Sequence, residues 1–268
     1  PALVREVAFA GKVQIGQLKG SVALAGNVKL PSELREATIV DCEIGDGVRI
    51  ANIRGHLSNY RIEKGAAIID VGVMATNKGA TFGNGVELET ANEGGGREVR
   101  IHNELSSQFA YLLAMHRYRP KLVQQLDKMV DGYVEKVKSD FGTVGEGAIV
   151  EHCDALLDVN VGPYACVSGA AKLENGTILS EKDAPTQVGS SVMAEDFIFA
   201  EGANVDTGAV LTKVFIGQAA KVGRQFSAEN TLMFANCEGF HSEAVAIFAG
   251  PYTVTHHRST LLIAGVYS

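Results

Sequence analysis

The amino-acid sequence predicts an all-β solenoid, in which short strands wind into a parallel β-helix that is interrupted by a helical segment. Three observations predict this fold. Aliphatic residues recur at every sixth position in three tracts, the chain has 30 glycines but only 6 prolines, and residues 77–141 lack the six-residue spacing. A period of six fits neither an amphipathic helix, with a period of about 3.6, nor a two-faced strand, with a period of about 2. It fits a solenoid whose repeating unit is one short strand and its corner.

Each tract has its own set of recurring aliphatic residues. His56 interrupts the first tract, the second slips by one residue after Leu156, and Asn204 occupies an empty slot in the third. The recurring residues are Ile44, Ile50, Ile62, Ile68 and Met74, then Val144, Val150, Leu156, Val161, Val167, Leu173 and Leu179, and finally Val192, Ile198, Val210, Ile216 and Val222. We expect their side chains to point into one shared core.

Three such units would make one triangular coil of about eighteen residues, in which each strand pairs in parallel with the equivalent strand of the next coil. Glycine and asparagine supply the left-handed or tight backbone conformations that corners need. Such residues occur at 45–47 (Gly-Asp-Gly), at 175–176 (Asn-Gly) and at Gly208, so we expect corners there. Ile44, Val167 and Ile216 should then lie in the same aliphatic column.

The spacing divides one continuous solenoid domain into three segments. Residues 1–76 should hold the N-terminal strands and the first coils, residues 77–141 an insertion with two helices, and residues 142–268 the main coils. Residues 13–16 and 21–26 alternate as strands do, so we expect them to cap or begin the stack. The chain stops at Ser268 just after an apolar run, which suggests a solenoid that is truncated at its C-terminus.

The insertion contains two helical patterns. Asn103 is a plausible N-cap for a first helix that carries Leu112 and His116. Pro120 suits the first residue of a second helix with an apolar stripe. We expect the two helices to form a hairpin that projects from the β-helix. The glycine run 94–96, followed by Arg97, is interpreted as a flexible hinge, with a phosphate cradle as the alternative.

Composition narrows the classes of function. The net charge of −7 argues against a nucleic-acid-binding surface, no apolar stretch is long enough to span a membrane, and no signal peptide opens the chain. We therefore expect a cytoplasmic protein without a nucleic-acid or membrane partner. The cysteines lack zinc-site spacing and are expected to be buried, reduced thiols. They are Cys42, Cys153, Cys166 and Cys237.

Polar and aromatic residues gather after Val222, where three of the seven histidines lie. At about eighteen residues per coil, His241 and His257 are nearly one coil apart, so they should lie on adjacent rungs of one face. Neighbours on a strand point to opposite sides, so only one of His256 and His257 can face a given cleft. In the alternative interpretation, one histidine packs in the core and the other is solvated.

The six-residue pattern resembles the hexapeptide-repeat superfamily of left-handed parallel β-helices, and the resemblance implies the left-handed coil. In acyltransferases of this superfamily, a histidine on a coil face is the general base, because neutral imidazole is available near neutral pH. The resemblance therefore implies His256 and His257 as catalytic residues, with Glu238 or Glu243 orienting an imidazole. It also implies acetyl-CoA or another acyl-CoA as cofactor. The neighbouring candidates for substrate binding are His241, Asn236, Glu238 and Arg258.

Three motifs carry a closer resemblance, and they lie at residues 92–98 (NEGGGRE), 234–241 (FANCEGFH) and 248–257 (FAGPYTVTHH). They resemble a bacterial family of long β-helix proteins that carries a domain-of-unknown-function label. Members of that family are sometimes labelled sugar-nucleotide transferase-like. The resemblance spans the whole chain.

Three interpretations of the function follow. The first is an acyl-CoA-dependent transferase that acts on a sugar or sugar nucleotide and works as a homo-oligomer, with a trimer favoured. The second is a non-catalytic β-helix scaffold or regulatory partner of a sugar nucleotidyltransferase. The third is a zinc enzyme similar to the γ-carbonic anhydrases, with Cys237, His241 and either His256 or His257 as ligands. That family's pair of closely spaced histidines is missing here, so our leading interpretation includes no metal site.

Overall fold

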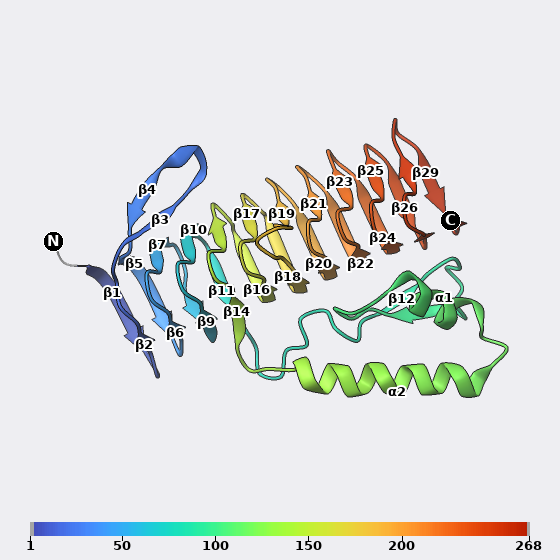
Figure 1. The fold of residues 1–268 in the computed structure, drawn as a ribbon, viewed down its shortest axis with the longest axis horizontal. Helices are drawn as coiled ribbons and strands as arrows, with labels where there is room; N and C mark the ends of the chain where they lie inside the picture. Colours follow the sequence, from blue (N-terminus) through green and yellow to red (C-terminus); the bar gives the residue numbers. More distant parts are fainter. Residues whose placement is uncertain (1–2, 267–268) are drawn as a thin grey trace.

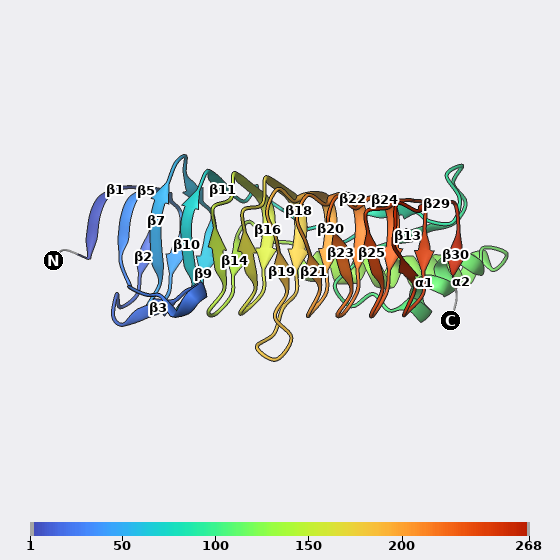
Figure 2. The same ribbon diagram turned by 90° about the horizontal axis from the view of Figure 1, so that it is seen from above.

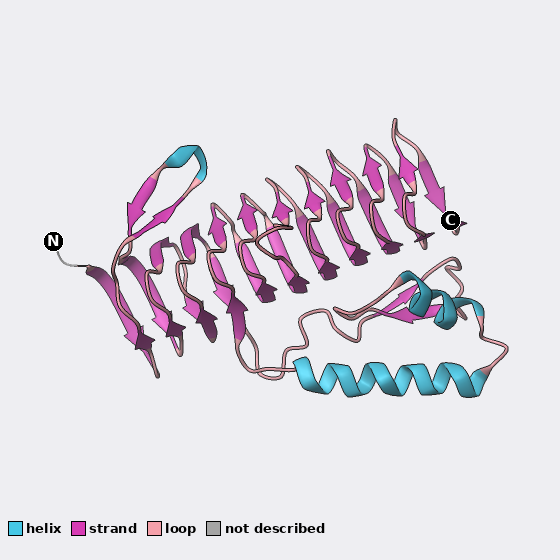
Figure 3. Ribbon diagram, in the orientation of Figure 1, coloured by secondary structure: helices cyan, strands magenta, loops and turns pink. Residues whose placement is uncertain are grey.

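The computed structural model describes residues 3–266 as a long parallel β-helix with a second layer packed along one side (Figures 1 and 2). Almost all of the regular structure is strand, together with two α-helices (Figure 3). The predicted fold class is therefore confirmed. The coils have three sides, which we number faces 1, 2 and 3 in the order in which the chain meets them. Ser268, where the sequence predicts a truncated end, lies outside the described residues.

The strands stack face by face. Those of face 1 alone are β7 (Arg49–Ile53), β10 (Ala67–Val71), β15 (Ile149–Glu151), β17 (Cys166–Ser168), β19 (Gln187–Val188), β21 (Asn204–Val205), β23 (Lys221–Gly223), β25 (Glu238–Phe240) and β28 (Val254–Thr255). Those of face 2 alone are β8 (Leu57–Ser58), β11 (Val73–Ala75), β26 (Glu243–Val245) and β29 (Thr260–Leu262). Those of face 3 alone are β2 (Gln14–Ile15), β6 (Glu43–Ile44), β9 (Tyr60–Ile62), β14 (Gly142–Val144), β27 (Phe248–Ala249) and β30 (Gly265–Val266).

Longer strands bend around a corner and belong to two faces. Those that join faces 1 and 2 are β1 (Val4–Ala10) and β5 (Leu34–Val40). Those that join faces 2 and 3 are β16 (Ala155–Val161), β18 (Lys172–Ile178), β20 (Met193–Phe199), β22 (Val210–Ile216) and β24 (Ser227–Met233).

The predicted coil of about eighteen residues is one or two residues too long for most coils. Val150 pairs with Val167, and Val205 pairs with Val222, so these coils repeat every 17 residues. These coils are shorter because a single residue with a left-handed φ turns the chain at the corner between faces 2 and 3. Asn175 (φ 46°) and Lys213 (φ 51°) are examples. The one-residue slip after Leu156 is therefore a regular feature of this corner.

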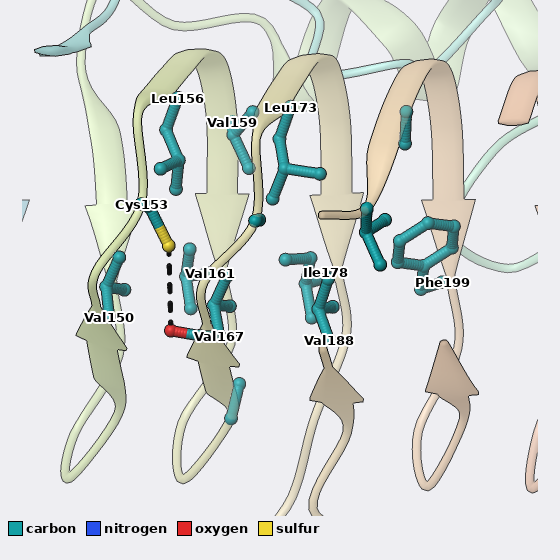
Figure 4. Close-up of a cluster of buried hydrophobic side chains, with 14 of the residues drawn as sticks. Val150, Cys153, Leu156, Val159, Val161, Val167, Leu173, Ile178, Val188 and Phe199 are labelled. Carbon is teal, nitrogen blue, oxygen red and sulfur yellow. Dashed lines mark hydrogen bonds between the residues drawn. The ribbon is translucent and has the colours of Figure 1, made fainter. Parts of the chain in front are cut away.

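The predicted corners are confirmed, because Gly47 (φ 68°), Asn175 and Gly208 (φ 71°) all have left-handed backbones. The predicted shared core is confirmed as well, since Ile44 and Ile216, which line face 3, and Val167, which lines face 1, belong to one buried cluster. Figure 4 shows how side chains from successive coils meet inside it.

The cysteines are free, as expected, and Cys42, Cys153 and Cys237 are buried whereas Cys166 is half-buried. The thiol of Cys153 points inward and donates to the carbonyl of Val167 at 3.8 Å (Figure 4). Burial raises the pKa of Cys153 to about 11, so this thiol stays protonated at neutral pH. The structure thus places the cysteines as packing residues.

In the third tract the predicted inward positions are partly wrong. Val210 is 42% exposed on the outside of face 2, and Ile198 is buried but points away from the axis. The inward residues are their neighbours Phe199 and Leu211. Leu179 likewise lies outside, next to the inward Ile178. The reason for the errors at Ile198 and Leu179 is that the strands there are apolar on both sides of face 3, so the six-residue spacing fits either side.

The segment between β11 and β14 is folded back along face 3 instead of projecting from it (Figure 1). It contains an antiparallel hairpin, β12 (Glu87–Glu89) and β13 (Glu98–Arg100), followed by α1 (Ser107–Met115) and α2 (Pro120–Val137). The N-cap of α1 is Ser106 and not Asn103, whereas Pro120 begins α2 as predicted. The predicted projection is wrong because the outer side of face 3 is apolar and needs a cover.

The glycine run is the turn of the β12–β13 hairpin rather than a hinge into the insertion. Gly95 (φ 78°) and Gly96 (φ 96°) have left-handed backbones. The carboxylate of Glu98 accepts a hydrogen bond from the Gly96 amide, and this contact lowers the pKa of Glu98. An acidic side chain thus already uses an amide that the phosphate interpretation needs.

The predicted opening strands have different fates. Residues 13–16 include β2, which begins the stack on face 3, whereas residues 21–26 include β3 (Ser21–Ala23), which leaves the stack. It forms an antiparallel hairpin with β4 (Lys29–Pro31), which stands beside the first coils in Figure 1. A short 3-10 turn, η1 (Ala25–Asn27), joins the two strands.

Candidate functional site

A groove runs between α1 and the outer surface of the β-helix. It consists of two adjoining cavities of about 410 and 520 Å³, which share Ser107, Gln108 and Pro251. We call the first the polar compartment and the second the aromatic compartment. Pockets of this size accommodate small-molecule ligands, so the groove is the leading candidate for a binding site.

The groove forms because α1 and face 3 meet along only part of their surfaces. The buried side of α1, with Ala110, Leu113 and Ala114, packs on the outer side of face 3. The aromatic rings of Phe215 and Phe234 lie 5.6 Å apart there. Ser106 caps the helix by accepting from the Phe109 amide at 3.2 Å, and this fixes where the helix begins. The side of α1 that carries Ser107, Gln108 and Tyr111 does not pack on face 3 and forms one wall of the groove.

The inserted segment is fixed to the β-helix near its start. The Gly83 amide donates to Asn175 Oδ1 at 2.8 Å, and the Thr177 hydroxyl donates to the Phe82 carbonyl at 2.7 Å. Gly83 has a φ of +80°, and a Cβ there would lie 2.5 Å from the carbonyl oxygen of Phe197. Only glycine fits such a position without a shift of the backbone.

Carboxylate and carboxamide groups dominate the polar compartment. Glu104, Gln108, Glu201 and Gln218 all line it. Gln218 Nε2 donates to Glu201 Oε2 at 3.2 Å, and Ser107 Oγ lies 3.2 Å from Gln108 Oε1. The carboxamides donate and accept hydrogen bonds and the carboxylates accept them, which suits a ligand with several hydroxyls. Two carboxylates in the lining make this compartment unsuitable for phosphate.

Tyr111, Leu112, His116 and Phe248 line the aromatic compartment. The His116 ring lies 5.8 Å from the Tyr111 ring and 5.6 Å from the Tyr118 ring. Its Nδ1 is buried and has no hydrogen-bond partner in the described part of the chain. A flat ring of a ligand can stack on such a surface.

The predicted histidines lie on another part of the molecule. Gly239 pairs with Thr255, so His241 and His257, each two residues further on, occupy equivalent places at the corner between faces 1 and 2. They lie on adjacent rungs, as their spacing predicts. Both are exposed.

The His256 side chain contacts three neighbouring side chains near this corner. Its Nε2 lies 3.4 Å from Glu238 Oε2, and its ring meets the Phe240 ring edge-on at 5.2 Å. The rings of His256 and His257 are 5.9 Å apart. The Nε2 and Oε2 atoms are close enough for an ion pair, but Nε2 forms no hydrogen bond within the described part of the chain. The structure thus brings Glu238, His256 and His257 together.

Neither of the cavities of the groove includes these residues. Arg258 follows them and is exposed, whereas Asn236 lies at the corner between faces 3 and 1. The substrate-binding set predicted from the sequence is therefore divided between two corners.

Sequence reasoning missed a histidine–aspartate pair, His152 with Asp70, on the same edge of the β-helix as His241 and His257. His152 Nδ1 lies 2.9 Å from Asp70 Oδ2, and Arg54 Nε lies 3.3 Å from Asp70 Oδ1. The hydrogen bond from His152 lowers the pKa of Asp70. The two residues are 82 positions apart, and only the stacking of β10 on β15 brings them together. No local motif signals such a pair.

Within residues 3–266, no group of three or more His, Cys, Asp or Glu side chains has an arrangement that could hold a metal ion. The thiol of Cys237 donates to the carbonyl of Gly250 at 3.1 Å inside the core, and burial raises its pKa. The ligand set that the zinc interpretation needs is therefore not assembled. Neither helix in this range is long and apolar enough to cross a bilayer.

The fold and the groove define the class: a parallel β-helix whose inserted segment folds back on one face to form a ligand-sized groove. Comparison with known proteins then places the chain within a family. The domain-of-unknown-function family DUF4954 matches residues 1–268, and the chain belongs to it. An uncharacterized protein of Treponema pallidum (strain Nichols) is 26% identical over 215 residues, which cover 76% of this chain. The match covers 30% of that relative's length.

Proposed function

We propose that the protein is an acyl-CoA-dependent transferase that binds a sugar nucleotide in the groove along α1. The observation that carries this proposal is that two joined compartments of opposite chemistry share Ser107, Gln108 and Pro251. A sugar nucleotide has the same division, with a hydroxyl-rich sugar at one end and a flat base at the other, and we place its diphosphate at the junction of the two compartments, beside Ser107 at the start of α1.

Each compartment supports one half of the ligand. In the polar compartment, the carboxylate of Glu201 accepts from sugar hydroxyls, while the amides of Gln108 and Gln218 both donate and accept. In the aromatic compartment, the base stacks against the Tyr111 ring, with the His116 ring at its edge.

The transfer itself follows from the resemblance to β-helix acyltransferases. A hydroxyl of the bound sugar attacks the thioester carbonyl, and its proton passes to a neutral imidazole. The carbon–sulfur bond then breaks, and the CoA thiolate takes the proton from the imidazolium and leaves as CoA. We assign the imidazole to His257, with Glu238 and His256 beside it. His257 lies on the edge between faces 1 and 2, whereas the groove follows face 3. We therefore propose that a complete site combines the groove of one copy with the histidine corner of another copy in the homo-oligomer.

Binding of the sugar nucleotide is tested by calorimetric titration with UDP-glucose, UDP and glucose. Tyr111→Ala should weaken UDP-glucose binding about tenfold, because it removes a stacking surface. Gln218→Ala should weaken it by a smaller factor, through one lost hydrogen bond. The matched control is Tyr164→Ala, at a corner outside the groove, which should bind as the wild type does. An absence of binding by all three probes would contradict the proposal.

The shared site has its own test, which uses release of free CoA from acetyl-CoA in the presence of UDP-glucose. His257→Ala and Tyr111→Ala should each have little turnover. A mixture of the two variants, allowed to exchange subunits, should regain part of the activity, because some sites then combine an intact groove with an intact histidine. A mixture that remains as inactive as its components would refute the shared site.

A second candidate function is a non-catalytic scaffold that partners a sugar nucleotidyltransferase. It is favoured by apolar side chains of the first coil, since Val4, Phe9 and Ile15 are each at least 40% exposed. A group of exposed apolar side chains suits a protein partner. The scaffold interpretation predicts that UDP-glucose and acetyl-CoA leave the thermal unfolding temperature unchanged.

A further inference from the structure

The first coils contain an arginine cluster that neither the groove nor the histidine corner uses. It consists of Arg5, Arg35 and Arg49 around the carboxylate of Glu33. Arg5 Nη2 lies 3.1 Å from Glu33 Oε2, while Arg49 Nη1 and Arg35 Nε lie 3.0 and 3.7 Å from Oε1. These are the ion pairs of Glu33 among residues 3–266. Three guanidinium groups thus share one carboxylate, and two positive charges are left without a partner.

The register of the strands creates this arrangement. Arg5 on β1 pairs directly with Arg35 on β5, so two like charges lie in neighbouring positions of a parallel ladder. Leu34 pairs with Ile50, which places Glu33 beside Arg49 on the next rung. Like charges that face each other across a ladder repel. The fold therefore concentrates positive charge here at a cost in stability.

Burial raises that cost. The Arg49 side chain is only 5% exposed, and its Nη1 also donates to the Pro31 carbonyl at 2.7 Å, next to the β3–β4 hairpin. The Nε atoms of Arg35 and Arg49 are both buried, and neither has a hydrogen-bond acceptor among residues 3–266. Buried charges in proteins are normally paired, so this cluster lacks a counter-charge.

The other side of the cluster is open to solvent. The Arg5 side chain is 51% exposed and that of Arg35 is 33% exposed. Residues 1–35 carry five lysines and arginines but two acidic residues, a net charge of +3 within a chain of −7. An anion is therefore attracted to this end of the molecule and repelled by the rest.

We propose that the arginine cluster is a binding site for a phosphate group, either free phosphate or the monoester of a small molecule. The exposed guanidinium groups of Arg5 and Arg35 donate to the phosphate oxygens, while Arg49 and Glu33 support them from beneath. A phosphate dianion would balance the two unpaired charges, and guanidinium matches its geometry. This site lies in the first coils and does not depend on the function proposed for the groove.

The test is calorimetric titration of the whole chain with inorganic phosphate and with glucose 1-phosphate, at constant ionic strength. Both should bind to the wild type. Arg35→Gln should weaken binding about tenfold or more, because it removes one charge-assisted contact. Lys12→Gln is the matched control: it removes the same charge from an exposed side chain of the first coil and should bind as the wild type does.

Each further outcome has a defined meaning. Tighter binding of glucose 1-phosphate supports the site and assigns it to a monoester, whereas equal or weaker binding supports it and assigns it to free phosphate. Arg5→Gln provides a second, half-exposed position if Arg35→Gln does not fold. Tyr111→Ala, in the groove, should leave phosphate binding unchanged. The proposal is overturned if neither probe binds at millimolar concentration, or if Lys12→Gln loses as much affinity as Arg35→Gln.

Discussion

The inside of the β-helix and the outer side of face 3 are both apolar, but they are built differently. Inside, each coil adds equivalent residues to the same columns, as Ile44, Ile62 and Val144 do in successive coils. On the outer side of face 3, Ile198, Phe215 and Leu232 also stack in register. Their partners, however, come from the inserted segment, such as Leu88 and Val99.

This difference separates the stability of the scaffold from that of the site. A residue in an inner column contacts the coils on both sides, so its loss is transmitted along the solenoid. A residue in the outer cluster joins two layers, so its loss can free the inserted segment while the coils remain stacked. Because α1 belongs to that segment, the groove depends on the outer cluster.

The largest effect should come from the inner column. Ile68→Ala removes a fully buried side chain and should lower the free energy of unfolding by about 2–5 kcal/mol. Leu88→Ala removes an equally buried side chain from the outer cluster, but should speed amide hydrogen exchange mainly within residues 77–141. Hydrogen exchange with mass spectrometry compares the two variants, because it measures amide exchange separately in the coils and in the inserted segment. Equal exchange in the coils of the two variants would show that the two layers unfold as one unit.

A smaller effect is expected where the inserted segment is fixed. Gly83→Ala places a Cβ 2.5 Å from a carbonyl oxygen at a left-handed φ, so it should weaken the attachment by about 1–3 kcal/mol. Gly96→Ala is the control, because Gly96 also has a left-handed φ but no atom within 4 Å of the added Cβ. Limited proteolysis should cut the inserted segment faster in Gly83→Ala than in Gly96→Ala. Equal rates would mean that backbone strain alone, and not the contact, decides the effect.

The same comparison explains which parts of the fold could be predicted. The inner columns repeat, so residues such as Ile50 and Ile68 identify the solenoid directly from their spacing. The outer side of face 3 repeats as well, but the residues that cover it come from the inserted segment, which has no such period. Strands such as β20, which ends in Phe197, Ile198 and Phe199, are buried on both sides, and periodicity cannot tell the inward residue from the outward one. The wrong prediction at Ile198 therefore has the same cause as the covering layer: the outer side of face 3 is apolar there.

The groove was less accessible to prediction than the fold. The helical pattern that contains Leu112 and His116 indicates a packing surface, but the groove arises only where α1 meets Gln218 and Pro251, more than a hundred residues later. The histidine corner was predictable in part, because one-coil spacing places His241 and His257 on adjacent rungs. Its catalytic role stays a prediction.

The smallest expected effect concerns the joint between the coils before and after the inserted segment. The hydrogen bond from His152, together with the nearby Arg54 charge, lowers the pKa of Asp70 in the folded state below its ordinary value of 3.8. A carboxylate with a lowered pKa stabilises the fold above its unfolded pKa, and this contribution is lost as the pH falls through the folded value. Both side chains are well exposed, so the pair should contribute less than about 1 kcal/mol.

Asp70→Asn removes this contribution while keeping the size of the side chain. Urea unfolding at neutral pH should show a small loss of stability relative to the wild type, and the two proteins should converge as the pH falls below about 4. High salt should reduce the difference at neutral pH, because exposed charge pairs are screened. A difference that persists unchanged at low pH would mean that Asp70 acts through packing and not through its charge.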